Sequence, residues 1–339
     1  MEENVLYIRA DASAAMGTGH VMRCLALGQT FQTLGGKVCF LTCCDSPSLA
    51  FRLDTEGFKR IDISPGMTPS DSLPRMLEIT RGRGWLVLDG YHFDPKFHQT
   101  VRRAGHRLLV VDDYRHLPYY DVDIILNQSA GSVDLNYNTP DSTRILSGFP
   151  YAMIRKEFLD QREGARGPSP HHRILVTMGG ADPGNSALKV IEALEAIEKI
   201  KVKVVIGPCN PHLAALQSRL KLESRFELVK SPDMPQLIRW ADMAVTAAGS
   251  TCLELCHLGV PFVMIITAEN QELLAQSLVA QGAAIHMGEI DSIHKKVLIQ
   301  TVMDLIENKE KRRVMACKSK ELVDGKGTFR IIREMNRSA

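Results

Sequence analysis

The sequence predicts an α/β protein built from two doubly wound parallel-sheet domains. Short, nearly continuous runs of Val, Ile and Leu recur along the chain, which is typical of parallel strands covered on both faces. Longer segments with helical spacing of apolar residues separate these runs. At 339 residues the chain is about twice as long as a typical domain, so two cores are expected.

The expected strands fall into two groups, one in each half of the chain. The first group covers residues 5–8, 38–43, 58–63, 85–89, 108–112 and 124–127. The second group covers residues 174–178, 202–206, 226–229, 244–247 and 262–266. Residues 161–172, which lie between the groups, are polar and rich in Gly and Pro, as interdomain linkers are. We therefore predict one Rossmann-like domain over residues 1–160, a linker over 161–172 and a second Rossmann-like domain over 173–339, facing each other across a cleft.

Composition and charge exclude several classes of protein. The chain has 41 Lys and Arg residues against 39 Asp and Glu residues, so it lacks the basic surface typical of nucleic-acid binding. Its 8 cysteines include no C-x-x-C pair, which favours reduced thiols over disulfides or zinc. No apolar run approaches the roughly 20 residues of a membrane span, and no signal-peptide pattern is found. We expect a cytoplasmic monomer that binds neither nucleic acid nor membranes.

The segment after the first expected strand carries the clearest chemical signal. It contains Gly17, Gly19, His20 and Arg23. A dinucleotide-binding loop would need a third glycine where Met22 stands, which disfavours that interpretation. Gly19 lets the backbone approach a ligand, and His20 falls in the first turn of the next helix, where the helix dipole lowers the imidazole pKa and favours a neutral base near pH 7. The alternative is a structural histidine that caps the turn.

Polar residues also follow later strands of the first half. Asp89 ends one expected strand and Tyr91 follows it, while Asp112 ends the next strand and Asp113 follows it. Paired aspartates suggest the acid–base chemistry of glycoside hydrolysis. Adjacent strand residues point to opposite faces, however, so one of the pair is expected to be structural. Asn127 ends a third strand, and its amide suits hydroxyl or acetamido groups.

In the second half, glycine turns follow two of the strands. Gly179 and Gly180 form a turn whose backbone N–H groups can receive phosphate oxygens. Later, Gly249 precedes Ser250 and Thr251 at the start of a helix.

Two more features of the second half bear on ligand binding. Glu254 lies at capping-box spacing from Thr251, so it either completes that box or binds the two hydroxyls of a ribose. Asn270 and Gln271 open a further helix and present amides. Because the chain contains neither a Walker lysine loop nor a metal-binding carboxylate pair, we expect no metal and no cofactor.

Together these motifs resemble one family. They are Arg9-Ala10-Asp11, Gly17-x-Gly19-His20-x-x-Arg23, Gly179-Gly180-x-Asp182, Gly249-Ser250-Thr251-x-x-Glu254 and Glu269-Asn270-Gln271. The chain is similar to the UDP-2,4-diacetamido-2,4,6-trideoxy-β-L-altropyranose hydrolases of pseudaminic acid biosynthesis. The resemblance runs from about Leu6 to the C-terminal helix.

The resemblance implies a GT-B fold, similar to that of the N-acetylglucosaminyltransferase that makes lipid II, with UDP held mainly by the second domain. It implies that His20 is the base that activates water, that Arg155 and Glu254 bind substrate, and that Tyr91 lies near the sugar. The implied reaction is inverting, metal-independent hydrolysis of a UDP-sugar. The candidate substrate contacts are Asp11, Gly17, Gly19, Arg23, Tyr91, Asn127, Arg155, Gly179, Gly180, Asp182, Gly249, Ser250, Thr251, Glu254, Asn270 and Gln271.

Three other functions remain open at this point. A glycosyltransferase would use the same fold and the same grip on UDP, but it would need an acceptor. A UDP-sugar 2-epimerase would release UDP by elimination and change the configuration at C2. A non-enzymatic nucleotide-sugar-binding protein would keep the Glu254 region without needing His20.

Overall fold

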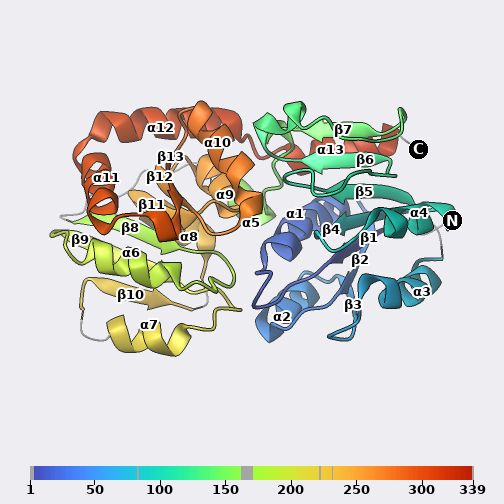
Figure 1. The fold of residues 1–339 in the computed structure, drawn as a ribbon, viewed down its shortest axis with the longest axis horizontal. Helices are drawn as coiled ribbons and strands as arrows, with labels where there is room; N and C mark the ends of the chain where they lie inside the picture. Colours follow the sequence, from blue (N-terminus) through green and yellow to red (C-terminus); the bar gives the residue numbers. More distant parts are fainter. Residues whose placement is uncertain (1–3, 82–83, 162–170, 221–222, 231, 338–339) are drawn as a thin grey trace. The chain divides into compact units, whose positions relative to one another are not determined.

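A computed structural model describes residues 4–81, 84–161, 171–220, 223–230 and 232–337 (Figure 1). The chain divides into two compact units. The first combines the described residues of Met1–Lys156 with those of Gly325–Ala339, and the second is Glu157–Asp324. Each unit contains a parallel sheet flanked by helices, which confirms the predicted fold class.

The first unit contains a parallel sheet with the strand order β3-β2-β1-β4-β5-β6-β7. Its strands are β1 (Val5–Ala10), β2 (Lys37–Thr42), β3 (Lys59–Asp62), β4 (Trp85–Asp89), β5 (Arg107–Val111), β6 (Ile124–Asn127) and β7 (Arg144–Ser147). Its helices are α1 (Gly19–Thr33), α2 (Pro47–Thr55), α3 (Pro69–Thr80), α4 (Pro95–Arg103) and α13 (Gly327–Arg337), with short 3-10 helices η1 (Ala130–Asp134) and η2 (Phe149–Tyr151).

Local sequence sets the starts of three of these helices. Each of α2, α3 and α4 has proline in its first turn, preceded by the capping residue Ser46, Thr68 or Asp94. Each capping side chain accepts a hydrogen bond from a backbone N–H of the first turn. Proline suits the first helical position because an N–H there would have no partner within the helix.

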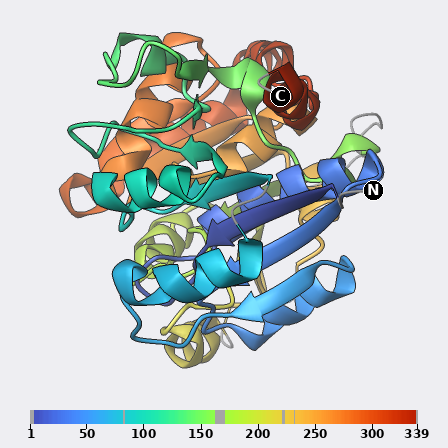
Figure 2. The same ribbon diagram turned by 90° about the vertical axis from the view of Figure 1, so that its right-hand side faces the viewer.

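Helices cover both faces of the first sheet (Figure 2), and apolar side chains fill the space between helices and sheet. Helices α1, α2 and α13 pack on one face, around residues such as Ile8 and Leu27. Helices α3 and α4 pack on the other face, around residues such as Leu88 and Val110. The central strands are therefore buried on both sides, which explains why their sequences are continuous apolar runs.

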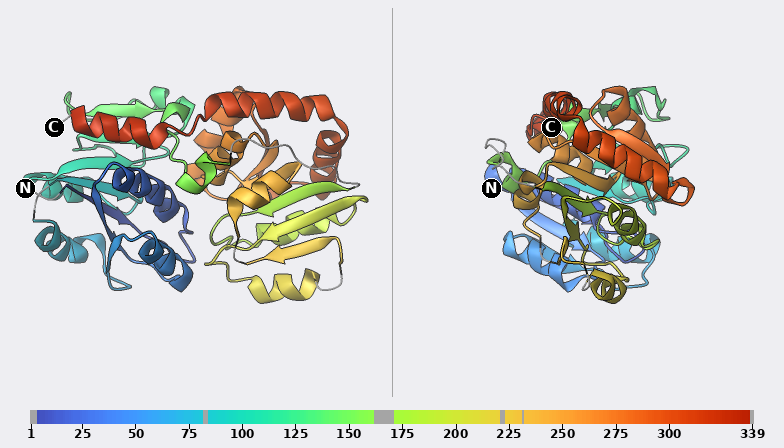
Figure 3. Two further views of the ribbon diagram at one scale, coloured as in Figure 1. Left: turned by 180° about the vertical axis from the view of Figure 1, so that it is seen from behind. Right: turned by 90° about the vertical axis from the view of Figure 1, so that its left-hand side faces the viewer.

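The second unit repeats this architecture with the strand order β10-β9-β8-β11-β12-β13 (Figure 3, right). Its strands are β8 (His172–Thr177), β9 (Ile200–Val205), β10 (Phe226–Val229), β11 (Met243–Ala247), β12 (Phe262–Ile266) and β13 (Ile285–Glu289). Its helices are α5 (Lys156–Leu159), α6 (Ser186–Leu194), α7 (Leu213–Leu220), α8 (Met234–Trp240), α9 (Thr251–Leu258), α10 (Glu272–Ala280), α11 (Lys295–Glu307) and α12 (Lys309–Leu322), with 3-10 helices η3 (Glu269–Gln271) and η4 (Ile290–Ser292).

The structure corrects the expected C-terminal boundary of the second domain. Residues from 325 onward were expected within 173–339, but they belong to the first unit. Helix α13 lies beside α1 (Figure 3, left), buries Ile331 and Ile332 in the core of the first unit, and bonds through Thr328 to Thr30 at 2.7 Å. Residues 162–170 of the expected linker lie outside the described residues.

Two strands of the structure, β7 and β13, were not predicted from the sequence. Both β7 and β13 are edge strands with half-exposed or polar positions, so neither is a continuous apolar run. Within the described ranges, no helix is both long and apolar enough to cross a membrane.

Candidate active site

In the first unit, the polar side chains of the candidate site lie where the strand order of the sheet reverses. β1 lies between β2 and β4, so the chain leaves β1 toward one side and β4 toward the other. Open α/β sheets bind ligands at this switch point, beyond the carboxyl ends of the strands. Ala10 pairs with Asp89, and Asp89 pairs with Val111, so the residues that follow β1, β4 and β5 meet at one edge.

His20 is held at this edge by Asp89. It is the second residue of α1, and its Nδ1 lies 2.6 Å from Oδ1 of the fully buried Asp89 carboxylate. With the Nδ1 proton donated to Asp89, Nε2 carries the lone pair. No hydrogen bond to Nε2 is found among the described residues. This is the geometry of an oriented imidazole base.

Arg23 lies one turn after His20 on α1 and joins two carboxylates. Its Nε and Nη2 donate to Asp89 at 2.7 and 2.8 Å, and its Nη1 and Nη2 donate to Asp113, both at 2.8 Å. Burial alone would raise the pKa of Asp89, but the Arg23 charge and His20 together lower it well below its usual range. Asp89 therefore stays ionised, and Arg23 is occupied by protein carboxylates.

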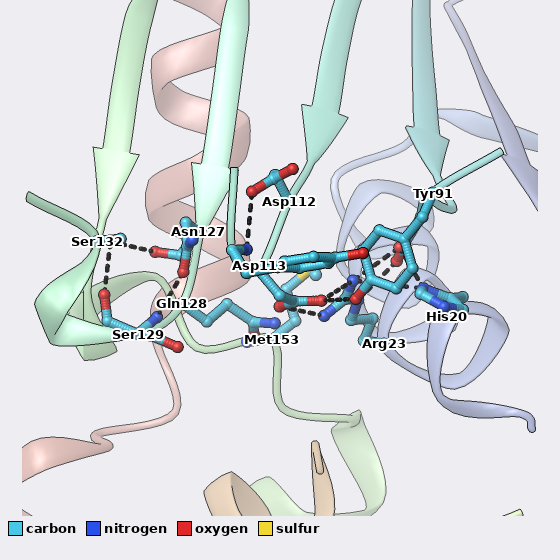
Figure 4. A network of polar contacts seen from close by, with 12 residues as sticks. His20, Arg23, Tyr91, Asp112, Asp113, Asn127, Gln128, Ser129, Ser132 and Met153 are labelled. Atoms are coloured by element: carbon cyan, nitrogen blue, oxygen red, sulfur yellow. Dashed lines mark hydrogen bonds and ion pairs between the residues drawn. The ribbon is translucent and has the colours of Figure 1, made fainter. Parts of the chain in front are cut away.

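Tyr91 completes the cluster (Figure 4). Its hydroxyl donates a hydrogen bond to Asp113, and its ring meets the ring of His20 edge-on, with centroids 5.1 Å apart. Burial and then the neighbouring Asp113 raise the pKa of Tyr91 well above its ordinary value. Tyr91 therefore remains a protonated hydrogen-bond donor beside the imidazole.

The paired aspartates divide their roles, as strand geometry predicts. Asp113 belongs to the cluster with Arg23 and Tyr91, whereas the fully buried Asp112 organises the loop that follows β5. Asp112 accepts backbone N–H bonds from Tyr114 at 2.9 Å and from Arg115 at 2.6 Å.

Two predicted substrate contacts of the first unit are occupied by protein partners. Asn127 is fully buried; its Nδ2 donates to Tyr137, and its Oδ1 accepts from the N–H of Ser129. Asp11 bonds to Arg9 at 2.9 Å, His92 at 3.1 Å and the backbone N–H of Cys43 at 2.7 Å. Both side chains therefore hold neighbouring loops of the first unit together.

Other predicted contacts of the first unit stay predictions. Gly17 has φ = +78°, a conformation that favours glycine, and it closes a turn by donating its N–H to the carbonyl of Ser13. Gly19 is the exposed first residue of α1. Arg155 is partly exposed near the end of the first unit.

The glycine turn of the second unit follows β8, beside that sheet's own switch point between β8 and β11. Gly179 and Gly180 form the turn, and a Cβ at Gly207 would lie 2.4 Å and 2.3 Å from their carbonyl oxygens. Gly207, which the sequence analysis did not single out, is therefore required for this close backbone approach. Asp182 caps α6 by accepting N–H bonds from Ser186 at 2.7 Å and Ala187 at 2.9 Å.

The loop after β11 presents groups of a different kind. A Cβ at Gly249 would meet no described atom within 4 Å. Ser250 is the N-cap of α9 without a side-chain capping bond, and no described partner hydrogen-bonds the Thr251 hydroxyl. The capping-box interpretation of Thr251 and Glu254 is wrong, because α9 already begins at Thr251 and a box needs that residue at the N-cap.

The amides that follow β12 have separate positions. Gln271 accepts a bond from the N–H of Thr267 at 2.9 Å and so closes the turn before α10. Asn270 lies in η3. Across the ranges that the structure describes, no group of three or more His, Cys, Asp or Glu side chains is arranged to hold a metal ion.

Asp89 and Asp113 are the site residues that the candidate set lacked. Asp89 ends β4 and Asp113 follows β5, and these positions were the available signal, but sequence spacing does not show that both carboxylates converge on Arg23.

Comparisons with known proteins show which families and structures this chain resembles. Residues 173–328 match the model of the glycosyltransferase family 28 C-terminal domain. The spore coat polysaccharide biosynthesis protein SpsG of Bacillus subtilis (strain 168) is 28% identical over 213 residues, which is 62% of this chain and 63% of that protein. This chain thus spans less than two thirds of the length of SpsG.

A second relative covers more of the chain. The UDP-2,4-diacetamido-2,4,6-trideoxy-β-L-altropyranose hydrolase of Campylobacter jejuni subsp. jejuni serotype O:2 is 24% identical over 280 residues, which is 81% of this chain and 96% of that protein. Among solved structures, MurG of Acinetobacter baumannii matches with a TM-score of 0.64 at 18% identity and covers 99% of both chains. The resemblance predicted from the motifs is thus confirmed: the chain is similar to the altropyranose hydrolase, it has the GT-B fold, and its residues 173–328 match the glycosyltransferase family 28 C-terminal domain model.

Proposed function

We propose that this protein hydrolyses a UDP-sugar, with UDP-2,4-diacetamido-2,4,6-trideoxy-β-L-altropyranose as the substrate, in pseudaminic acid biosynthesis. The observation that carries the proposal is the His20–Asp89 pair: Nδ1 of the imidazole is fixed, and the hydrogen bonds of His20 to other described residues involve this nitrogen and not Nε2. A protein that only binds nucleotide sugars has no need of an oriented base.

In the proposed step, His20 Nε2 takes a proton from water while the water oxygen bonds to the anomeric carbon. The bond from that carbon to the β-phosphate oxygen breaks, and UDP leaves from the opposite face, so the anomeric centre inverts. UDP is a good leaving group, so protonation by a general acid is less necessary than for an ordinary glycoside. This agrees with the roles of Asp112 and Asp113, which are occupied by protein partners.

The charges around His20 favour this proton transfer. One guanidinium, that of Arg23, bonds to two carboxylates, Asp89 and Asp113. When Nε2 accepts a proton, the imidazolium supplies a second positive charge to the cluster. Nearby opposite charges stabilise a charged group, most of all where water is excluded.

The second unit supplies the nucleotide contacts in this proposal. The N-terminus of α9 carries backbone N–H groups and the hydroxyls of Ser250 and Thr251, which suit a diphosphate. The relative's name specifies a UDP-sugar, which supports UDP as the nucleotide. Glu254, one turn into α9, is proposed as the ribose ligand, and Gly179 and Gly180 as further phosphate contacts.

The test is turnover of the UDP-sugar in ¹⁸O-labelled water, followed by NMR and mass spectrometry before the product sugar mutarotates. Hydrolysis places solvent oxygen on C1, inverts that centre and leaves C2 unchanged. Label in UDP instead of the sugar, or retention at C1, would contradict the mechanism. A changed configuration at C2 would identify a 2-epimerase.

A glycosyltransferase is the second candidate, because residues 173–328 match a glycosyltransferase domain model. The same experiment separates the two activities. A transferase consumes little UDP-sugar until an acceptor is added, whereas a hydrolase reaches full turnover in water alone.

A further inference from the structure

A second buried Asp–His pair lies beside the first, and the proposed reaction does not use it. Nδ1 of His116 lies 2.5 Å from Oδ2 of Asp112, and the His116 side chain is only 6% exposed. Its Nε2 is buried and has no hydrogen-bond partner among the described residues. Burying a polar atom without a partner is destabilising, so an imidazole at this position needs a physical reason.

His116 is held rigidly from the core side. Its ring meets the ring of Tyr120 edge-on, with centroids 5.9 Å apart. Tyr120 is fully buried; its hydroxyl donates to Asp112 at 2.7 Å and accepts the N–H of Leu117 at 3.0 Å. The Tyr137 hydroxyl adds a further bond to Asp112 at 2.8 Å. The imidazole is therefore fixed to the sheet by a carboxylate with several donors.

On its other side, His116 contacts the aromatic group that supports the base. The rings of His116 and Tyr91 meet edge-on with centroids 5.2 Å apart, and those of Tyr91 and His20 with centroids 5.1 Å apart. Edge-to-face ring pairs at such separations are attractive, and the attraction depends on the orientation of the rings. An unbroken series of ring contacts thus runs from the core residue Tyr120 through His116 and Tyr91 to His20.

We propose that His116 is a positioning residue for His20. Its ring, fixed by Asp112 and Tyr120, holds Tyr91 against the imidazole of His20 and so limits rotation of that imidazole about its bond to Asp89. This inference rests on the proposed function for its effect on turnover, but its effect on the His20 ring is independent of that function.

Two substitutions separate the ring from the hydrogen bond. His116→Asn keeps an N–H donor near the position of Nδ1 but removes the ring, whereas His116→Phe keeps the ring but removes the donor. If ring contact positions His20, His116→Asn shifts the His20 imidazole signals in ¹⁵N and ¹³C NMR, and His116→Phe leaves them near the wild-type values. The His20 signals among the 11 histidines are assigned by their loss in His20→Ala.

Turnover gives the second readout. A small misplacement of a catalytic group can cost up to about a hundredfold in rate, so His116→Asn is expected to lower kcat by about ten- to a hundredfold, with KM nearly unchanged. His116→Phe is expected to restore most of that loss. His116→Gln provides a second ringless variant if His116→Asn does not fold.

The matched control is His106→Asn. His106 is buried in the same unit, beside the first residue of β5, and it bonds to Thr80 at 2.7 Å. Its substitution is expected to lower Tm without moving the His20 signals.

Unchanged His20 signals in a folded ringless variant would overturn the inference, and so would a shift in His116→Phe that His116→Asn lacks. If wild type releases no UDP from any UDP-sugar, the proposed function fails while the NMR comparison still decides the role of His116.

Discussion

The two sheets present different chemistry at the same topological position. In the first unit, the edge beside β1 and β4 is filled by His20, Arg23 and Asp89, which bond to one another. In the second unit, the edge beside β8 and β11 presents glycine backbone and two hydroxyls without described partners. One architecture thus supports two kinds of site, a preorganised charge cluster and a surface of helix N–H groups.

The difference between the two units can be measured on two buried carboxylates, Asp89 in the first unit and Asp182 in the second. The pKa of Asp89 in the first unit is lowered, because the Arg23 charge and His20 outweigh its burial. The pKa of Asp182 in the second unit is raised, because burial outweighs its bonds from the N–H groups of Ala187 and Ser186. Partner charge therefore dominates at the first switch point, and desolvation dominates near the second.

The largest expected effect is that of Asp89→Asn. An asparagine cannot hold the Nδ1 proton of His20 as a carboxylate does, so the imidazole loses its tautomer and its compensating charge. UDP release from the UDP-sugar is expected to fall by about 10²- to 10⁴-fold. The UDP affinity, measured by calorimetry, should remain unchanged because the proposed nucleotide contacts lie in the second unit. Weakened UDP binding with normal turnover would reverse the assignment of roles.

The pH dependence of the unfolding free energy distinguishes Asp89 from Asp182. Asp89 has a lowered pKa, so its contribution to unfolding free energy is present above about pH 4 and declines as pH falls. Asp182 has a raised pKa, so its effect has the opposite sign: the contribution is present at low pH and declines as pH rises through its folded pKa. Each group can change the slope by up to about 1.4 kcal/mol per pH unit.

Urea unfolding of Asp89→Asn and Asp182→Asn between pH 3 and 6 checks these signs. Compared with wild type, the unfolding free energy of Asp89→Asn is expected to fall less steeply as the pH is lowered. The unfolding free energy of Asp182→Asn is expected to fall less steeply as the pH is raised. Two variants with the same change in slope would contradict the assigned causes.

Asn127→Ala tests whether a predicted substrate contact is structural. The change leaves the Ser129 N–H without its acceptor and the Tyr137 hydroxyl without its donor, so the unfolding free energy should fall by about 1–3 kcal/mol. KM for the UDP-sugar should stay near that of wild type. A large rise in KM in a variant of normal stability would return Asn127 to the substrate site.

The smallest effect is expected from the double variant Ser250→Ala, Thr251→Ala. It removes two hydroxyls but keeps the backbone N–H groups of α9, so UDP should bind about tenfold more weakly, which corresponds to about 1.4 kcal/mol. Turnover at saturating substrate should hardly change. Calorimetry with UDP gives the first value, and steady-state kinetics gives the second.

Much of the fold could be predicted from sequence because buried parallel strands are continuous apolar runs. The same criterion missed β7 and β13, since edge strands carry polar or exposed residues. Membership of α13 in the first unit could not be predicted, because it depends on contacts such as that of Thr328 with Thr30, nearly 300 residues away in sequence.

The candidate site could likewise be predicted from the sequence only in part. His20 and Arg23 were identifiable because a strand, glycines and a helix follow one another in sequence. The roles of Asp89 and Asp113 depend on strand register, which no local pattern encodes. The capping-box interpretation failed because the start of α9 shifted by one residue.

The central claim is that the free nitrogen of His20 takes a proton from the attacking water. Its most direct test is the rate of UDP release by His20→Ala, with UDP affinity measured on the same preparation. The account predicts a fall of about 10²- to 10⁴-fold in rate with the affinity for UDP retained. Near-normal turnover by that variant would contradict it.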